Sequence, residues 1–305
     1  MTETKPNNNW LCGYKYPYDD QNGFQVGFQD LPSLTPKLLP TSTEDEATRI
    51  FEAWRGASAR RLFKLNSFWE IAIQISQEKR TNQYSDQDLS GTIVIPIWFK
   101  KDPALEDGNT VSQSFLKIPE DQSNLLLLDG ASVPLPWLFS FLSFGLLRPL
   151  GVMLTASIVH DFAFEYGGLI YREQDESLSE EVLIFKRVSR DLTDQLFRDL
   201  IATVNEMRIT AFLAWIAVRL GWYFVKYDGK PRGGDAFPWT ATIALIAALS
   251  LLGGMIVTLG LEVTITAIAL LYSVLFVTLK LTAPPAEVES TRETCPVSEE
   301  ASTKS

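Results

Sequence analysis

The sequence predicts a mainly α-helical globular domain with a few short β-strands, an α+β arrangement, plus a C-terminal two-helix transmembrane hairpin. Two observations predict this fold class. Apolar residues recur at helical spacing through much of residues 41–235, with short β-branched and aromatic runs between them. Residues 236–261 then contain no charged side chain, and a second uncharged run follows at residues 263–279. Runs of this length and purity are typical of membrane-spanning helices.

The composition divides the chain into four segments. Residues 1–40 are rich in Asn, Pro, Gly and aromatic residues without a clear period, which predicts an irregular N-terminal arm or short strands around residues 25–28. Residues 41–235 form the predicted globular domain, and residues 236–281 form the predicted transmembrane hairpin. Residues 282–305 are acidic and rich in Pro and Ser, which predicts a disordered tail.

Local patterns predict the elements of the globular domain. Thr43 with Glu46 three residues later is a capping-box pattern, which indicates the start of a helix. Apolar spacing predicts further helices, and Gly167 with Gly168 ends one of them. Pro96 favours an edge position for the strand that contains it. The predicted helices of the domain are 68–77, 150–166, 182–207 and 211–225. Its predicted strands are 92–99 and 125–128, in addition to the strand around 25–28 in the N-terminal arm, and residues 173–181 are a predicted acidic loop.

Charge and residue counts exclude several classes of function. The chain carries 27 Lys and Arg residues against 37 Asp and Glu residues, and a net charge of −10 argues against a nucleic-acid partner. Cys12 and Cys295 lie in opposite tails, which excludes a disulfide framework and a cysteine-ligated zinc site. His160 is the only histidine, so metal sites that need two imidazoles are also excluded.

The uncharged C-terminal runs predict an integral membrane protein. Only a helix satisfies its own backbone groups in hydrocarbon, so residues 236–261 are a predicted span and residues 263–279 a second span at the short limit. Gly253 and Gly254 are small residues that favour homo-oligomer formation through the transmembrane helices. The alternative is a buried helical hairpin in a soluble protein. Residues 211–225 are too short for a span and are predicted as a buried or interfacial helix.

The flanks of the hairpin predict its orientation. Basic residues lie at both ends, whereas Glu262 is the only charge at the tip. By the positive-inside tendency, the globular domain is cytoplasmic, in the plasma (inner) membrane or an internal bacterial membrane. The flanking residues are Lys226, Lys230, Arg232 and Lys280.

Polar residues in the middle of the chain can carry chemistry. Asp194 or Asp191 can accept a hydrogen bond from one nitrogen of His160 and leave the other nitrogen as a general base. Asp129 and Asp161 can supply hard oxygen ligands to Ca²⁺ or Mg²⁺. A bound cation would polarise a carbonyl or phosphoryl oxygen, as in metal-assisted hydrolysis.

The same residues also fit structural roles. His160 can be a hydrogen-bonded core histidine. Arg190, Asp194 and Arg198 are four residues apart, which also describes a surface ion-pair ladder. Ser132 lies in a partial match to a nucleophile elbow, in which proline replaces the second glycine.

Four motifs in order resemble a known family. They are residues 129–134 (DGASVP), His160 with Asp161, Arg190 with Asp194 and Phe197, and residues 217–221 (AVRLG). The set is similar to a bacterial and bacteriophage domain family of unknown function, DUF1353, over about residues 117–225. That family brings no established activity to the chain.

A more distant resemblance implies a mechanism. The order Asp-Gly-x-Ser, then His-Asp-Phe, then a helix with Asp-x-x-Phe is similar to prokaryotic and fungal secreted phospholipase A-two. This resemblance implies that His160 is the general base, that Asp161 and Asp129 hold Ca²⁺, and that Asp194 orients His160.

Two functions therefore stay open. The first is a membrane-anchored domain that acts as a His-Asp, metal-assisted hydrolase of lipid esters, with the bilayer as partner and a phospholipid as substrate. The second is a non-catalytic, membrane-associated interaction or assembly module in which the His/Asp cluster is structural.

Overall fold

The computed structural model of the 305-residue chain describes ten parts of it. They are residue 11 and residues 13–20, 23–37, 62–84, 89–100, 107–117, 126–128, 153–175, 180–223 and 237–282. Thr43 and Glu46 of the predicted capping box lie outside the described residues, and so do Asp129 and Ser132.

A seven-stranded sheet forms the centre of the domain, and every described strand pairing in it is antiparallel. The spatial order of its strands is β1 (Tyr16–Asp20), β2 (Phe24–Phe28), β5 (Trp69–Ile75), β6 (Gly91–Ile95), β9 (Gly168–Asp175), β10 (Glu180–Arg187) and β7 (Thr110–Val111). A second antiparallel sheet contains β3 (Leu34–Lys37), β4 (Leu62–Leu65) and β8 (Leu127–Leu128).

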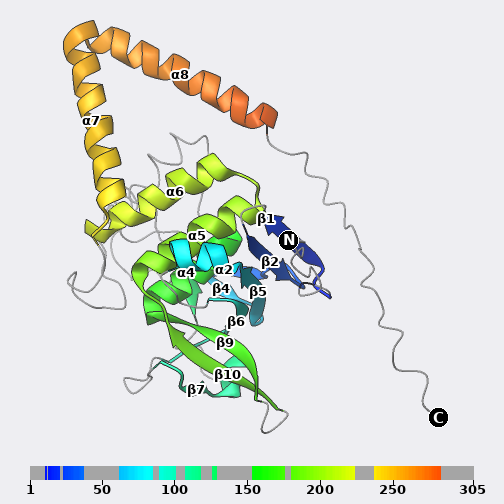
Figure 1. Ribbon diagram of the computed structural model, residues 1–305. Coiled ribbons are helices and arrows are strands. Elements are labelled where there is room, and N and C mark those ends of the chain that lie inside the picture. Colours follow the sequence, from blue (N-terminus) through cyan, green and yellow to red (C-terminus); the bar gives the residue numbers. More distant parts are fainter. Residues whose placement is uncertain are drawn as a thin grey trace, which may run out of the picture.

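Helices pack in layers on the large sheet. The helices α4 and α5 contact the sheet and each other, and α6 packs on α5. Figure 1 shows α6 lying across α5 on the side away from the strands, while α7 projects away from the domain. The helices are α2 (Gln77–Gln83), α4 (Leu154–Tyr166), α5 (Arg190–Val204), α6 (Arg208–Leu220), α7 (Trp239–Leu259) and α8 (Leu261–Thr282), with short 3-10 turns η2 (Gln113–Leu116) and η4 (Gly221–Tyr223).

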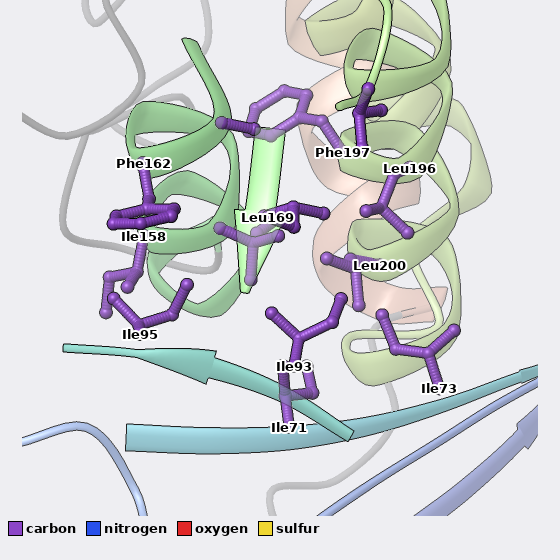
Figure 2. Close-up of a cluster of buried hydrophobic side chains, with 14 of the residues drawn as sticks. Ile71, Ile73, Ile93, Ile95, Ile158, Phe162, Leu169, Leu196, Phe197 and Leu200 are labelled. Atoms are coloured by element: carbon purple, nitrogen blue, oxygen red, sulfur yellow. The ribbon is translucent and has the colours of Figure 1, made fainter. Parts of the chain in front are cut away.

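The hydrophobic core lies between the sheet and the α4–α5 pair. Isoleucines of β5 and β6 face aliphatic and aromatic side chains of the two helices (Figure 2). Burying one such side chain contributes about 1.5–3 kcal/mol, so this layer fixes how α4 and α5 sit on the sheet. The labelled residues of the cluster are Ile71, Ile73, Ile93, Ile95, Ile158, Phe162, Leu169, Leu196, Phe197 and Leu200.

The predicted fold class is wrong in its strand content. About 53% of the described residues are helical, but 26% lie in strands, and seven of those strands form one large sheet. Residues 68–77 were expected to be helical and instead contain β5, in which Trp69, Ile71 and Ile73 are buried at alternate positions. The first six residues of the predicted helix 182–207 belong to β10, and the predicted acidic loop is largely part of the β9–β10 hairpin.

Other local predictions are confirmed. Gly167 ends α4 in a left-handed conformation, with φ of 75°, which a residue with a side chain rarely adopts. The predicted strands appear as β2, β6 and β8. The predicted edge position is wrong, because β6 lies between β5 and β9 and Pro96 follows its last residue.

The predicted two-helix transmembrane hairpin is also wrong. Two helices are present, with Gly260 between them at φ of 80°. Among the described residues, however, only one helix is long and apolar enough to cross a membrane, over Trp239–Thr258. The apolar stretch found in α8 is Leu261–Leu271. At about 1.5 Å per residue this stretch covers about half of the ~30 Å hydrocarbon layer of a bilayer.

Candidate functional site

Three helices bring six charged side chains together, and we call this group the buried charge cluster. The helix α4 contributes two of them, α5 contributes three and α6 contributes one. Its members are His160, Asp161, Arg190, Asp191, Asp194 and Arg219.

Asp194 lies at the centre of the buried charge cluster and has no exposed surface. Its Oδ1 accepts a hydrogen bond from His160 Nε2 at 2.9 Å. Its Oδ2 accepts one from Arg219 Nη1 at 3.3 Å and lies 3.9 Å from Arg190 Nε. Because Arg190 is four residues before Asp194, one turn of α5 places both side chains on the same face. One carboxylate therefore links α4, α5 and α6.

Arg219 makes the second link between α5 and α6. Its Nη1 lies 3.2 Å from Asp191 Oδ1 and 3.3 Å from Asp194 Oδ2. The other oxygen of Asp191 accepts a hydrogen bond from Gln195 Nε2 at 2.8 Å. Asp191 and Asp194 are three residues apart, which puts both carboxylates within reach of one guanidinium.

Aromatic rings surround the imidazole of His160. The ring stacks on Phe164 at 5.4 Å and tilts against Phe197 at 5.0 Å, and Arg190 lies over Phe164 at 5.0 Å. Only 5% of His160 is exposed. Its Nδ1 lies 3.9 Å from Asp161 Oδ1, which is an ion-pair distance and longer than a hydrogen bond.

These surroundings keep His160 protonated. Burial alone would lower the pKa of His160, but the carboxylates of Asp161 and Asp194 outweigh it and raise the pKa from 6.5 to about 9. At pH 7 the cluster then holds three formal positive charges and three formal negative charges, which balance. A general base must be unprotonated at the working pH, and an imidazole with this pKa is not.

The structure places the predicted site residues as follows. It brings His160 and Asp194 into direct contact and sets Asp161 beside the ring. Asp129 lies outside the described residues. Within the described parts of the chain, no three His, Cys, Asp or Glu side chains are grouped so as to hold a metal ion. Asp161 alone does not make a calcium site, so the Ca²⁺ site stays a prediction.

The alternative of a surface ion-pair ladder is wrong. Arg190 and Asp194 are both buried, whereas a ladder of that kind lies in solvent. Arg198, the third member, turns instead to Asp199 at 2.9 Å and to Gln83 at 3.1 Å.

The sequence did not reveal two features of the polar core. Arg219 is the only charged residue in the apolar segment 211–225, and that isolation was the available signal, because a buried arginine needs a carboxylate partner. A second buried group was missed, in which Asp199 accepts a hydrogen bond from Tyr84 Oη at 2.8 Å and pairs with Lys79 Nζ at 3.1 Å. It ties α2 to α5.

Comparison with known proteins gives one match. No curated protein and no solved structure matches the chain. One family model matches residues 123–218, about a third of the chain. This region contains α4 and α5 and ends within α6, one residue before Arg219. The phospholipase likeness and the bacterial or phage origin stay predictions. Residues 123–218, which carry every member of the buried charge cluster except Arg219, match the family described as "Protein of unknown function (DUF1353)".

Proposed function

We propose that the chain is a membrane-anchored module and that its buried charge cluster joins three helices and has no catalytic role. One observation carries the proposal. The helix α7 contains 20 consecutive residues, Trp239–Thr258, long and apolar enough for a bilayer, and only 6% of this stretch is buried in the protein. A core helix of a soluble protein would be mostly buried, so this apolar surface requires another environment.

The dimensions of α7 support a single span. Its 21 residues extend about 32 Å at 1.5 Å per residue, close to the ~30 Å hydrocarbon layer. Its large side chains, among them Leu249, Leu251 and Val257, lie exposed along its length. The sequence just before it contains Lys226, Lys230 and Arg232, which favours a cytoplasmic position for the domain.

The contacts of the buried charge cluster support its structural role. Asp194 uses both oxygens to hold groups from two other helices, and the cluster balances its charges internally. The imidazole of His160 is enclosed by rings of Phe164 and Phe197. A side chain so enclosed and protonated is suited to fixing helix positions, as buried ion pairs do elsewhere by specifying one arrangement.

Extraction of membranes at alkaline pH tests the anchor. The full chain should stay in the pellet, because an integral helix resists carbonate. A variant with Ile246→Lys and Leu249→Lys should move largely to the supernatant, since these residues lie in the middle third of α7, where a lysine is costly.

A matched variant, Thr240→Lys with Leu261→Lys, controls for added charge. It carries two lysines as well, one at the second residue of α7 and one just beyond its C-terminal end, at the first residue of α8, where the ammonium groups reach the headgroups, and it should stay in the pellet. Release of the unmodified chain by carbonate, or its recovery in the soluble fraction without detergent, contradicts the proposal.

The lipid-ester hydrolase is a second candidate, and one observation favours it. Asp194 holds Nε2 of His160, while Nδ1 has no hydrogen-bond partner among the described residues. This is how a carboxylate orients a catalytic imidazole.

An assay of phospholipid hydrolysis separates the two candidates. The full chain and its His160→Gln variant are incubated with short- and long-chain phospholipids, with Ca²⁺ or with a chelator. The structural role predicts no hydrolysis above background in either protein. Calcium-dependent hydrolysis by the unmodified chain that His160→Gln abolishes, with the fold intact by circular dichroism, would establish the hydrolase instead.

A further inference from the structure

The helix α6 buries small side chains and exposes large apolar ones, which is the reverse of the usual arrangement. Its buried face, packed on α5, contains small residues, among them Ala211, Ala214 and Ala217. Its outer face contains large apolar residues: Ile209 is 56% exposed, and Phe212 and Leu213 are 46% exposed each. A helix at a water-exposed surface normally turns its large apolar side chains inward.

The outer face of α6 is continuous along the helix. Ile209, Phe212 and Leu213 follow helical spacing of three and four residues, and the half-buried Ile216 and Leu220 extend the same stripe. We call these five residues the outer face of α6. The helix contains no carboxylate, and its two charges are Arg208, which is exposed, and Arg219, which the buried charge cluster holds.

The outer face of α6 leads into the membrane anchor. An aromatic group joins the end of α6 to the start of α7, with Trp222 and Phe237 rings 5.2 Å apart and Phe237 and Trp239 rings 4.6 Å apart. Tyr223 Oη and Thr242 Oγ1 lie 2.7 Å apart, within hydrogen-bond distance. Tryptophan and tyrosine gather at the headgroup level of membranes. Figure 1 shows α7 starting beside α6 and leaving on the side away from the sheet.

We infer that the outer face of α6 lies in the interfacial layer of the same bilayer that α7 enters. The occupant of this face is the phospholipid surface. The size of the apolar side chains, the lack of carboxylates and the continuity with α7 are what an in-plane interfacial helix requires. The domain is therefore docked on the membrane with α6 flat against it. The inference rests on the proposed anchor.

Depth-dependent quenching tests this inference on the full chain. With Cys12 and Cys295 replaced by serine, a single cysteine is introduced as Leu213→Cys or Ile209→Cys and labelled with an environment-sensitive dye. The chain is reconstituted into vesicles of phosphatidylcholine and phosphatidylglycerol that carry a nitroxide near the headgroup. Both positions are exposed, so neither label disturbs packing, and two positions guard against a local misfold.

Two further labels serve as references for depth, one in solvent and one in the middle of the bilayer. Thr81→Cys lies on the exposed side of α2 and should show no quenching, while Leu249→Cys, in the middle of α7, should respond to a nitroxide deep in the acyl chain. We expect the labels at 209 and 213 to lose most of their emission with the shallow nitroxide and to shift to the blue.

The outcomes distinguish this inference from the proposed anchor. Deep quenching at 249 with none at 209 and 213 overturns the docking of α6 and leaves the anchor standing. No quenching at any of the three positions overturns the anchor as well. Energy transfer between copies labelled at 213, without quenching by lipid, also overturns the inference and assigns the outer face of α6 to a second copy of the chain.

Discussion

Replacing Asp194 by asparagine will lower the free energy of unfolding by about 3–5 kcal/mol, the range measured when one partner of a buried ion pair is removed. The substitution keeps the size of the side chain and removes only its charge. Arg219 and the protonated His160 then stay buried with less negative charge than positive charge around them. An amide also presents one NH₂ group where Asp194 presents two acceptors, so one of its two hydrogen bonds is lost.

Asp191→Asn is the matched control for Asp194→Asn. Asp191 lies three residues earlier on α5 and pairs with the same Arg219, but its side chain is 34% exposed. Water compensates for part of the lost charge there, so we expect about 1 kcal/mol or less. Urea unfolding of the full chain in a nonionic detergent, followed by circular dichroism, gives both values. Equal destabilisation by the two variants would contradict the central role of Asp194.

Raising the pH from 6.5 to 9 will lower the free energy of unfolding by about 3 kcal/mol through His160 alone. In the unfolded chain His160 titrates near 6.5, whereas in the folded chain its pKa is about 9. Between these values the folded chain holds a proton that the unfolded chain has released, so stability falls as pH rises. The stabilisation is complete below pH 6.5 and is lost as the pH passes through 9.

The groups that face His160 set the direction of this dependence. Asp161 on α4 and Asp194 on α5 favour the imidazolium. Arg190 and Arg219 pair with Oδ2 of Asp194, the oxygen that does not contact His160. Asp191, which pairs with Arg219, is the remaining charged residue of the buried charge cluster. The two carboxylates nearest the ring, Asp194 at 2.9 Å and Asp161 at 3.9 Å, therefore act more strongly than the two guanidinium groups behind Asp194.

His160→Gln is the control for the pH experiment. Because His160 is the only histidine in the chain, the variant removes every imidazole, and the loss of stability between pH 6.5 and 9 that belongs to it should disappear. In the unmodified chain, the imidazole resonances in an NMR titration come from a single ring and should move with a midpoint of about 9. A midpoint near 6.5 would show that the carboxylates do not control the ring.

The sequence predicted helices better than strands, for a physical reason. In β5, Trp69, Ile71 and Ile73 alternate with smaller or polar residues, but seven residues are few enough for the same run to fit a helix after Asn66 and Ser67. In β10 the apolar run leads almost directly into α5, and only the cap at Ser189 separates them. Each strand also has one pairing partner far away in the sequence, β2 for β5 and β7 for β10, and local periodicity gives no information about such a partner.

The candidate site was predicted in part. Asp194 or Asp191 was expected to accept a hydrogen bond from His160, and Asp194 accepts it. The burial of that carboxylate and the arrival of Arg219 from a third helix depend on how α6 packs across α5. Such packing follows from tertiary contacts, which local patterns do not encode. The protonation of His160 depends on the same contacts, so the sequence alone could not predict it either.

The position of Arg219 has a mechanical consequence. It lies one residue before the end of α6, and η4 and then α7, the proposed anchor, follow it along the chain. A force that pulls α7 away from the domain passes through the contact of Tyr223 with Thr242 and then through the Arg219–Asp194 contact, before it reaches the hydrophobic layer on the sheet. The Arg219–Asp194 ion pair therefore bears tension before the hydrophobic layer does, and its rupture would separate α6 from α5 while the sheet, α4 and α5 keep their arrangement.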